Sequence, residues 1–439
     1  MGPNIALVSG EGSGDTVGGA LAVAVRRLWP QVAIWGLGSS RMAAAGVELL
    51  ADSAEWGAIG VVEALKVYPR LRYGIYPALI AQVRRRRPAL VVLIDFGAFN
   101  VKVARWCKAS GVPVLYYFPP GSWRRNGTAR SELGRVTDRI ATPFPWSAER
   151  LREMGANVEF VGHPLLDLSR PSLTRAQFAE RFGMEPGHPI VGLLPGSRRF
   201  EVTYNTPAML AAAARISRTV TNAQFVYSVA PTIAPERAVA LVRGFRPQPG
   251  KGDHQGFRPV CGARRDARKE PQLITPEGVV VPSTYLQRRE RAARRTDAAA
   301  LPPIVLCSGM TQDLIAHADV LLACSGTVTL EAAILGTPMV ILYRGSRLMA
   351  MEYRLRRLQR VEHIGMPNII AGRRIVPELR QEEASPERLA DEAIRLLRDP
   401  TARATMKDDL RQVREALGEP GATERVAHIV LEMAGRRET

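Results

Sequence analysis

The sequence predicts an α/β protein made of two consecutive doubly wound parallel sheets. Short apolar runs rich in β-branched residues alternate with stretches of helical length, which is the pattern of βαβ units. The run Leu90–Ile94 is apolar at every position, as expected of a parallel strand buried on both faces. A second series of the same kind starts after Pro164. Two such series predict two Rossmann-like domains that face a central cleft, with ligands beyond the carboxyl ends of the strands.

The first domain is expected over residues 1–165. A helix is expected between Gly18 and Leu28, where apolar residues recur with helical spacing. The expected strands are 4–9, 32–36, 90–94 and 112–117.

The second domain is expected over residues 166–439. A helix is expected at 208–218, and the last helices of the chain are candidates for packing back on the first domain. The expected strands are 189–194, 224–228, 320–323 and 339–342.

Residues 244–302 interrupt the second series. They are basic, contain scattered Pro and Gly, and have little apolar periodicity. A structureless loop of this length is uncommon inside a compact domain, so we expect a mostly disordered insertion with a basic helix near 285–295. Contact with nucleic acid or anionic lipid is one interpretation, and a solvated insertion or a sequence artefact is the favoured one.

The amino-acid composition excludes several classes of protein. The 439 residues are 46% hydrophobic, which excludes a disordered chain, and four scattered cysteines without a CxxC pair exclude a disulfide scaffold. Six histidines without metal-ligand spacing predict no metal and no cofactor. The first strand starts almost at Met1, which leaves no room for a signal peptide. A reducing cytoplasm is therefore expected, and no run is apolar enough to span a membrane.

The chain is strongly basic, with 60 Lys and Arg against 42 Asp and Glu, a net charge of +18. Such a charge attracts nucleic acid, an anionic membrane or phosphorylated substrates, although a bias toward Arg in the composition explains it equally well. No helix-turn-helix, RRM or zinc-finger pattern accompanies the charge, so specific nucleic-acid binding is not expected.

A glycine-rich turn, Gly10–Asp15, follows the first expected strand and precedes a helix. Small residues there allow a ligand to approach the backbone, and the N–H groups of a helix N-terminus favour an anion. The spacing is neither GxGxxG nor a Walker A loop. Taken alone the turn is equally consistent with a simple strand-to-helix connection.

Two turns of the second domain suit phosphate. Arg198 follows the strand at 189–194, and an ion pair with Glu201 is its alternative role. Ser325, Gly326 and Thr327 open a helix after the strand at 320–323. Glu331 lies on the next turn, where its carboxylate suits ribose hydroxyls or simply the helix dipole. Together these turns make a nucleoside diphosphate plausible.

Asp95 ends the strand at 90–94 and lies at the edge of the first sheet. A carboxylate there suits a general base that takes a hydroxyl proton. Capping of the helix that follows is the alternative role.

Six motifs occur in the same order as in the lipid-A-disaccharide synthase family, and the chain resembles that family everywhere except at 244–302. Each motif alone is unspecific, but the ordered set is specific. The motifs are Ser9–Asp15, Ile94–Asn100, Val161–Pro164, Leu193–Glu201, Ser325–Glu331 and Met366–Gly372.

The resemblance implies a GT-B glycosyltransferase that needs no metal, with residues 1–165 as the acceptor domain and 166–439 as the UDP-sugar-binding domain. The implied reaction moves 2,3-diacylglucosamine from UDP to 2,3-diacylglucosamine 1-phosphate (lipid X) with inversion, forming a β-1,6 disaccharide in lipid A biosynthesis. Such a transfer needs a base near the acceptor hydroxyl and positive charge near the leaving diphosphate. The alternatives are a UDP-GlcNAc 2-epimerase-like enzyme and a non-catalytic relative that binds nucleotide sugars or membranes.

The resemblance also implies roles for individual residues. Asp95 and Glu11 take the catalytic positions, and His163 begins the hinge, where a structural hydrogen bond is its favoured role. The acceptor side is assigned to Ser13, Gly14 and Asn100. The UDP-sugar positions are Gly196, Ser197, Arg198, Ser325, Gly326, Thr327, Glu331 and Asn368.

Two positions depart from the family pattern. Ala98 stands where the family has a second Asp, and 118–125 replaces a Trp-rich segment. These changes indicate a divergent member whose acceptor or acyl specificity differs.

Two stretches are candidates for contact with an anionic membrane, at 61–80 and 347–360. Both interleave apolar residues with basic ones, and ordinary packed helices are the alternative. We therefore expect a cytoplasmic protein, peripheral on the inner face of the cytoplasmic membrane, with a homodimer as a further expectation.

Overall fold

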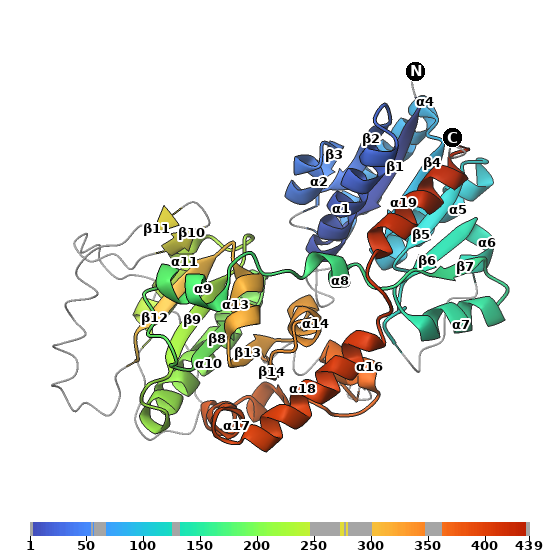
Figure 1. Cartoon of the computed structure of the whole chain (residues 1–439). Coiled ribbons are helices and arrows are strands. Elements are labelled where there is room, and N and C mark those ends of the chain that lie inside the picture. The colour runs from blue at the N-terminus through green and yellow to red at the C-terminus, as the bar shows by residue number, and fades with distance from the viewer. Residues whose placement is uncertain are drawn as a thin grey trace. The chain divides into compact units, whose positions relative to one another are not determined.

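The computed structural model describes residues 3–53, 56, 67–124, 132–245, 273–275, 278–279, 301–346 and 362–435 (Figure 1). The chain divides into two compact units. The first combines Met1–Leu168 with Arg414–Thr439, and the second is Ser169–Val413. Each unit is a parallel sheet with helices packed on it, as the sequence predicted.

The first unit contains a seven-stranded sheet in the order β3-β2-β1-β4-β5-β6-β7, with every pair parallel. The order reverses between β1 and β4. The strands are β1 Asn4–Ser9, β2 Ala33–Gly38, β3 Glu48–Asp52, β4 Leu90–Ile94, β5 Val114–Tyr117, β6 Arg139–Thr142 and β7 Val158–Phe160. The helices are α1 Gly12–Leu28, α2 Ser40–Ala44, the π-helical turn η1 Arg70–Ile75, α4 Tyr76–Arg86, α5 Gly97–Ala109, α6 Leu133–Val136, α7 Pro145–Glu153, α8 Leu165–Leu168 and α19 Ala422–Met433.

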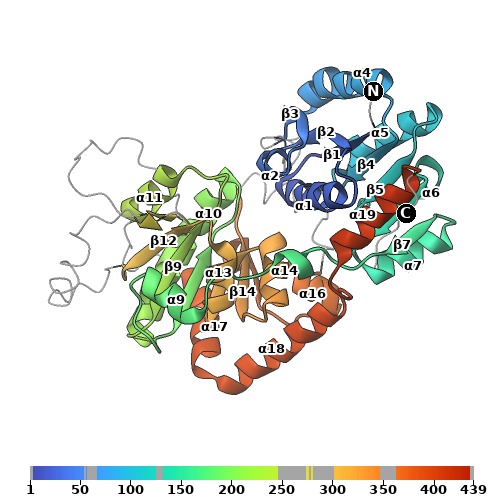
Figure 2. The same ribbon diagram turned by 45° about the horizontal axis from the view of Figure 1, so that its top comes forward.

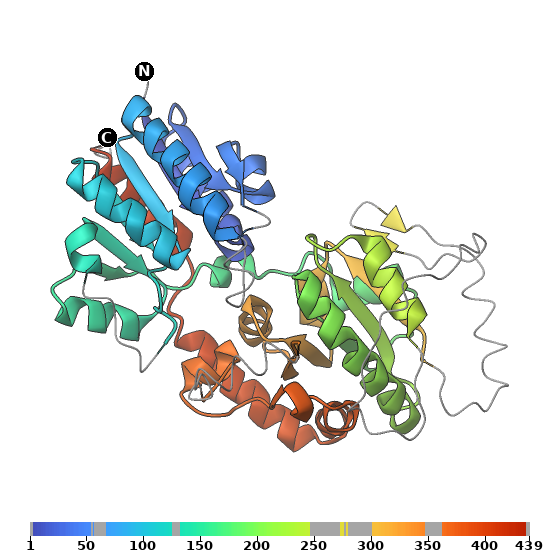
Figure 3. The same ribbon diagram turned by 180° about the vertical axis from the view of Figure 1, so that it is seen from behind.

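Helices cover both faces of this sheet, so its strands are buried on both sides. Helices α1 and α19 lie side by side on one face (Figures 1 and 2). The view from behind shows α4 and α5 in blue and cyan on the other face (Figure 3). Alternate residues of β4 point to opposite faces of the sheet. Leu90, Val92 and Ile94 belong to the apolar core on the side of α1. Val91 and Leu93 belong to the core on the side of α5. This double burial explains the uninterrupted apolar run.

The C-terminal helix belongs to the first unit. Val426, Ala427 and Val430 of α19 are fully buried in the same apolar cluster as Leu21 and Val25 of α1. Burial of apolar side chains is the main force holding α19 in place.

The second unit contains an eight-stranded sheet in the order β11-β10-β12-β9-β8-β13-β14-β15. All pairs are parallel except β10 with β11. The strands are β8 Ile190–Leu194, β9 Gln224–Val229, β10 Leu273–Thr275, β11 Gly278–Val279, β12 Ile304–Ser308, β13 Val320–Cys324, β14 Met339–Tyr343 and β15 Glu378–Arg380. The helices are α9 Arg175–Arg181, α10 Arg199–Thr219, α11 Pro235–Gly244, α13 Thr311–His317, α14 Thr327–Ile334, α16 Met366–Ala371, the 3-10 turn η3 Gln381–Glu383, α17 Pro386–Arg398 and α18 Pro400–Glu415.

Two details differ from the sequence-based expectations. Helix α10 starts at Arg199 and continues through Pro207, whereas the sequence predicted a helix only after this proline, which lacks the amide donor. The described part of 244–302 includes two short strands that the sequence did not predict, β10 and β11 at the edge of the sheet, while the expectation of disorder for most of the segment stays a prediction. Strands of two and three residues are too short to show alternation. The expected basic helix at 285–295 lies outside the described residues.

No helix in the described ranges is long and apolar enough to cross a membrane. Of the two stretches expected at a membrane surface, 347–360 lies outside the described residues and 61–80 is described only from Val67 onward. That described part carries Tyr68 and Tyr73, which are large exposed aromatic residues.

Two valines of α1 provide a matched test of the packing of the first unit. Val25 is fully buried, whereas Val23 is 58% exposed. We expect Val25→Ala to lower the free energy of unfolding by about 2 kcal/mol, because it removes buried methyl groups and leaves a cavity. Val23→Ala should change it by less than about 0.5 kcal/mol. Thermal and urea unfolding measure both, and equal effects would contradict this packing.

Candidate active site

The candidate residues of the first unit lie where the strand order reverses, which is where open parallel sheets bind ligands. The carboxyl ends of β1, β4 and β5 are in register, with Ser9 beside Ile94 and Ile94 beside Tyr117. The residues that follow these strands, Gly10, Asp95 and Phe118, therefore emerge at one edge of the sheet.

The backbone at this edge is strained. Asp95 and Phe96 have φ values of +49° and +51°, and Phe118 has +58°, in the left-handed region that non-glycine residues rarely occupy. Three hydrogen bonds hold Asp95 there. Its N–H donates to Tyr117 O at 3.0 Å, and its carbonyl accepts from Asn100 Nδ2 at 2.9 Å and Tyr116 Oη at 2.8 Å. Such over-determined strain is typical of functional sites.

Asn100 is part of the support beneath Asp95. Its side chain is fully buried, and Nδ2 also approaches the carbonyls of Val8 at 3.3 Å and Ile94 at 3.2 Å. It thus ties the ends of β1 and β4 together. The sequence placed Asn100 on the acceptor side of the site, but the structure encloses it among backbone groups, where it orients Asp95.

The Asp95 carboxyl group has an unusual acidity. Its removal from water raises its pKa to about 7, and the nearby Glu11 carboxylate adds to the rise, while the N–H of Phe96 opposes it. Glu11, the N-cap residue of α1, is therefore close to Asp95. A carboxyl group with a pKa near neutrality suits proton transfer.

The glycine-rich turn packs tightly against this edge. A Cβ atom at Gly10 would lie 2.3 Å from the ring of Phe96, and one at Gly14 would lie 2.4 Å from Ser9 Oγ. A larger residue at Gly10 would therefore displace the Phe96 ring, and one at Gly14 would require the Ser9 hydroxyl to rotate. Ser13 is exposed in the first turn of α1, whereas Gly14 is buried. Of the two, only Ser13 has a side chain that a ligand can reach.

The last residue of the turn, Asp15, is structural. Its buried carboxylate accepts from the N–H groups of Ser39 at 2.6 Å, Arg41 at 2.9 Å and Met42 at 3.2 Å. These N–H groups lie at the start of α2, so Asp15 caps that helix from a distant part of the chain.

His163 is also structural. It is buried, its Nδ1 accepts from the N–H of Leu165 at 3.2 Å, and its ring contacts Phe118 and Phe144. Burial lowers its pKa to about 3, so the ring is neutral at physiological pH. Its geometry suits the structural role that the sequence favoured. Ala98, which replaces the family's second Asp, lies exposed on the first turns of α5.

The second unit has an equivalent edge, between β8 and β13, where its strand order also reverses. Gly196, Ser197 and Arg198 follow β8, and the buried carboxylate of Glu201 organises them. It accepts from the N–H groups of Ser197 at 3.0 Å and Arg198 at 3.1 Å, and from Arg198 Nη1 at 2.9 Å. Gly196 has φ +121°, and a Cβ there would lie 2.5 Å from the Glu201 carboxylate. The ion pair considered from the sequence thus exists, and it orients Arg198.

The neighbouring strand β13 ends in the turn that opens α14. Ser325 donates its N–H to Leu342 O at 3.0 Å and its hydroxyl to Ile364 O at 2.8 Å. Gly326 and Thr327 are exposed at the N-terminus of α14, and Glu331 is partly buried on the next turn. The exposed N–H end of the helix favours an anion.

Asn368 is buried and completely hydrogen-bonded. Its Oδ1 accepts from the N–H groups of Ile375 at 2.7 Å and Val376 at 2.9 Å. Its Nδ2 donates to Val376 O at 2.9 Å and to Glu378 Oε1 at 2.8 Å. The resemblance assigned Asn368 to donor binding, whereas its contacts here hold the loop after α16. It also bonds the carboxylate of Glu378, which in turn shapes the loop before α16.

Glu378 was not identified from the sequence, yet it organises the same loop. Its buried carboxylate accepts from the N–H groups of Ile364 at 2.9 Å and Gly365 at 2.8 Å. It therefore fixes Ile364, whose carbonyl receives the Ser325 hydroxyl. An acidic residue in a buried strand was the available signal.

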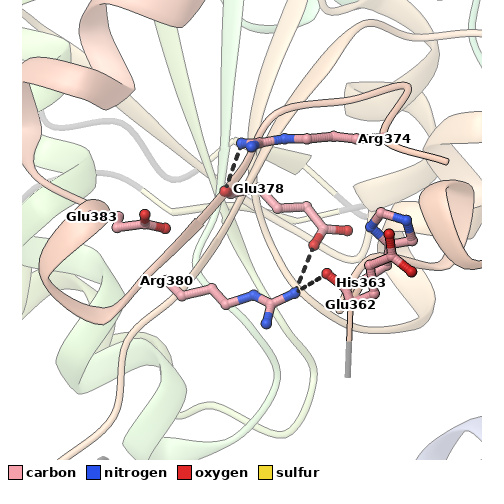
Figure 4. Close-up of a pocket in the computed structure, with 6 residues that line it drawn as sticks. All are labelled: Glu362, His363, Arg374, Glu378, Arg380 and Glu383. Atoms are coloured by element: carbon pink, nitrogen blue, oxygen red, sulfur yellow. Dashed lines mark hydrogen bonds and ion pairs between the residues drawn. The ribbon is translucent and has the colours of Figure 1, made fainter. Parts of the chain in front are cut away.

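A pocket of about 370 Å³ opens beside this loop (Figure 4). Arg380 Nη2 donates to the carbonyl of Glu362 at 2.6 Å and approaches the Glu378 carboxylate at 3.3 Å. Arg374 donates to the Glu378 carbonyl at 2.9 Å. The pocket is lined by Glu362, His363, Arg374, Glu378, Arg380 and Glu383. Among the described residues, no cluster of His, Cys, Asp and Glu could hold a metal ion.

The cap formed by Asp15 gives a stability prediction. Asp15→Ala should lower the free energy of unfolding by about 2 kcal/mol or more, because it leaves buried N–H groups without an acceptor. The adjacent Thr16→Ala is the control, since Thr16 Oγ1 contacts only the carbonyl of Gly12 within its own helix. Thermal unfolding compares the two variants. An Asp15→Ala protein as stable as the control would show that the cap is dispensable.

Comparison with known proteins identifies the family. The sequence model of the lipid-A-disaccharide synthetase family matches residues 5–243 and 278–433. The lipid-A-disaccharide synthase of Geobacter metallireducens is 35% identical over 99% of this chain and 98% of the relative. That of Geobacter sulfurreducens is 36% identical over the same shares, and that of Myxococcus xanthus is 32% identical over 98% of this chain and 97% of the relative.

Solved structures show the fold. Neisseria meningitidis UDP-GlcNAc 2-epimerase, bound to UDP-GlcNAc, has a TM-score of 0.56 at 10% identity, covering 98% of this chain and 100% of that chain. Acinetobacter baumannii MurG has a TM-score of 0.51 at 12% identity over the same shares. At such low sequence identities the likeness shows a shared fold only. The epimerase alternative therefore has no support from sequence. The synthases, in contrast, match this chain in sequence along its whole length. The chain belongs to the lipid-A-disaccharide synthase family of glycosyltransferases with the GT-B fold.

Proposed function

We propose that this protein transfers 2,3-diacylglucosamine from UDP to the 6-hydroxyl of 2,3-diacylglucosamine 1-phosphate, with inversion, to form the β-1,6 disaccharide of lipid A biosynthesis. Membership of the family supports this reaction. The observation that carries it is Asp95, a carboxylate held in a strained turn at the ligand-binding edge of a parallel sheet with a pKa of about 7.

Asp95 is the proposed base. It takes the proton of the acceptor hydroxyl as that oxygen attacks the anomeric carbon of the donor sugar. Glu11 keeps the pKa of Asp95 high through its negative charge, and we assign it and the exposed Ser13 to the acceptor side. Gly14 allows close packing of that turn. Asn100 contributes as a positioning residue, since it bonds the carbonyl of Asp95.

The second unit is the proposed donor-binding unit. The guanidinium of Arg198 and the N–H groups of the turn Ser325–Thr327 would stabilise the negative charge that develops on the UDP leaving group. The carboxylate of Glu331 suits the ribose hydroxyls. Gly196 and Ser197 shape the turn that carries Arg198. Asn368 donates to Glu378, which holds the loop whose Ile364 carbonyl accepts from Ser325.

Both proposed substrates carry acyl chains, so we propose that the enzyme works at the cytoplasmic face of the cytoplasmic membrane. The exposed aromatic residues Tyr68 and Tyr73 in a basic stretch support this placement. Self-association as a homodimer stays a prediction, and light scattering tests it by measuring the molar mass in solution.

Replacement of the base tests the proposal directly. Asp95→Asn keeps the backbone hydrogen bonds of the turn and removes the proton acceptor, so we expect kcat to fall by about 10²–10⁴-fold with UDP affinity retained. Disaccharide formation and UDP release are measured with both lipid substrates in detergent. Asp408→Asn, an exposed position on α18, is the control. A wild-type protein that binds UDP and forms no disaccharide would instead support the non-catalytic relative.

The raised pKa of Asp95 gives a pH prediction. The base must be ionised, so kcat/KM of the wild type should fall as the pH drops below about 7. Because the charge of Glu11 raises this pKa, Glu11→Gln should move the midpoint of the acidic limb to lower pH. The pH profile of kcat/KM measures the midpoint independently of any loss of rate. An unchanged or higher midpoint would show that Glu11 does not act on Asp95.

A further inference from the structure

Two cations of the first unit, Lys102 of α5 and Arg72 of η1, lie around Tyr76. Lys102 Nζ is 3.9 Å from the centre of the Tyr76 ring, and Arg72 lies four residues before Tyr76, about one helical turn. Partial burial lowers the pKa of Lys102, and the positive charge of Arg72 lowers it further. In the described part of the chain neither residue contacts a carboxylate. The other cations of α5 differ, since Arg105 pairs with Glu132 and Lys108 pairs with Asp138. Lys102 and Arg72 therefore form a site of uncompensated positive charge.

A row of aromatic rings connects these cations with the candidate base. Lys102 Nζ lies 3.9 Å from the centre of the Tyr76 ring. The Tyr76 ring meets that of Phe99 at 6.1 Å, and Phe99 meets Phe96 at 5.0 Å. Phe96 directly follows Asp95. Phe99 and Lys102 are three residues apart on α5, so they share one side of the helix.

The spacing along α5 suits a single sugar residue. Asp95 lies just before α5, which begins at Gly97, and Lys102 lies five residues into the helix, about 7.5 Å along its axis at a rise of about 1.5 Å per residue. In a hexosamine 1-phosphate, the 6-hydroxyl and the phosphate are at opposite ends of one pyranose ring. A ligand whose hydroxyl meets Asp95 would thus bring its phosphate to Lys102, across a surface of aromatic rings.

We propose that Lys102 and Arg72 form the subsite that binds the phosphate of the sugar acceptor. This inference rests on the proposed function, because it assigns one end of the same substrate. Two nearby cations bind a phosphate by charge-assisted hydrogen bonds, and the phosphate in turn relieves their mutual repulsion. The subsite selects an acceptor that carries an anomeric phosphate over one that lacks it. The phosphate of an anionic lipid headgroup has the same chemistry and is the source to be distinguished.

The test compares two acceptors, 2,3-diacylglucosamine 1-phosphate and the same lipid without phosphate, on the full-length enzyme. We expect Lys102→Met to raise KM for the phosphorylated acceptor by about 10-fold or more, with kcat at saturation little changed. Lys102→Arg should retain most of the wild-type KM. We define the phosphate preference as kcat/KM for the phosphorylated acceptor divided by kcat/KM for the acceptor without phosphate. This preference should fall in Lys102→Met, and it should fall further in the double variant that also carries Arg72→Gln.

Lys108→Met is the matched control, the same substitution on the same helix at an exposed ion pair. It should keep the wild-type phosphate preference. A Lys102→Met enzyme with the wild-type preference would overturn the proposal.

A second experiment measures binding of the protein to phosphatidylglycerol vesicles by sedimentation, without substrate. The proposal expects Lys102→Met and wild type to bind them equally within about twofold. Lost vesicle binding with an unchanged phosphate preference would assign the two cations to the membrane and overturn the proposal.

Calorimetry separates this subsite from the proposed reaction, because binding needs no turnover. The wild type and Lys102→Met are titrated with short-chain diacylglucosamine 1-phosphate and with its dephosphorylated form. Phosphate-dependent binding that requires Lys102 supports the subsite even if no disaccharide forms, in which case only the proposed reaction fails. Equal affinity for both forms in an enzyme that makes disaccharide would overturn the subsite alone.

Discussion

The candidate site of the first unit depends on the hydrogen bonds to one carbonyl, that of Asp95. Asn100 from α5 and Tyr116 from β5 both donate to it, and they stabilise a backbone conformation that Asp95 would not adopt alone. The strained turn places the carboxyl group in an environment that raises its pKa. The buried sheet holds the turn in this strained conformation, because helices pack on both faces of the sheet and make it rigid.

The second unit uses the same principle with carboxylates as the buried support. Glu201 gathers the donors of the Ser197–Arg198 turn, and Glu378 gathers those of the loop around Ile364. In each case a buried carboxylate fixes a turn or loop at the edge of the sheet. Removal of an enclosed support leaves several donors unsatisfied at once, so substitutions at these supports should affect binding and folding together.

The sequence predicted the positions of the main strands well, because apolar runs report burial on both faces. It also predicted Asp95 and the turns after β8 and β13, since strand ends at the reversal of order can be inferred from the pattern. It could not show which polar residues point inward. The sequence placed Asn100 and Asn368 among the ligand-binding residues, yet both side chains are buried among backbone groups. Glu378 was missed, and so was the pair of Lys102 and Arg72, because proximity of residues on different elements depends on tertiary packing.

The position of α19 affects how the molecule is made. Its apolar residues complete the core beneath α1, although they leave the ribosome only after the whole second unit has been synthesised. During translation the N-terminal sheet therefore has part of one apolar face uncovered, because α1 alone covers it until α19 has been synthesised. A chain that ends before α19 would leave the apolar side of α1 exposed, which favours aggregation.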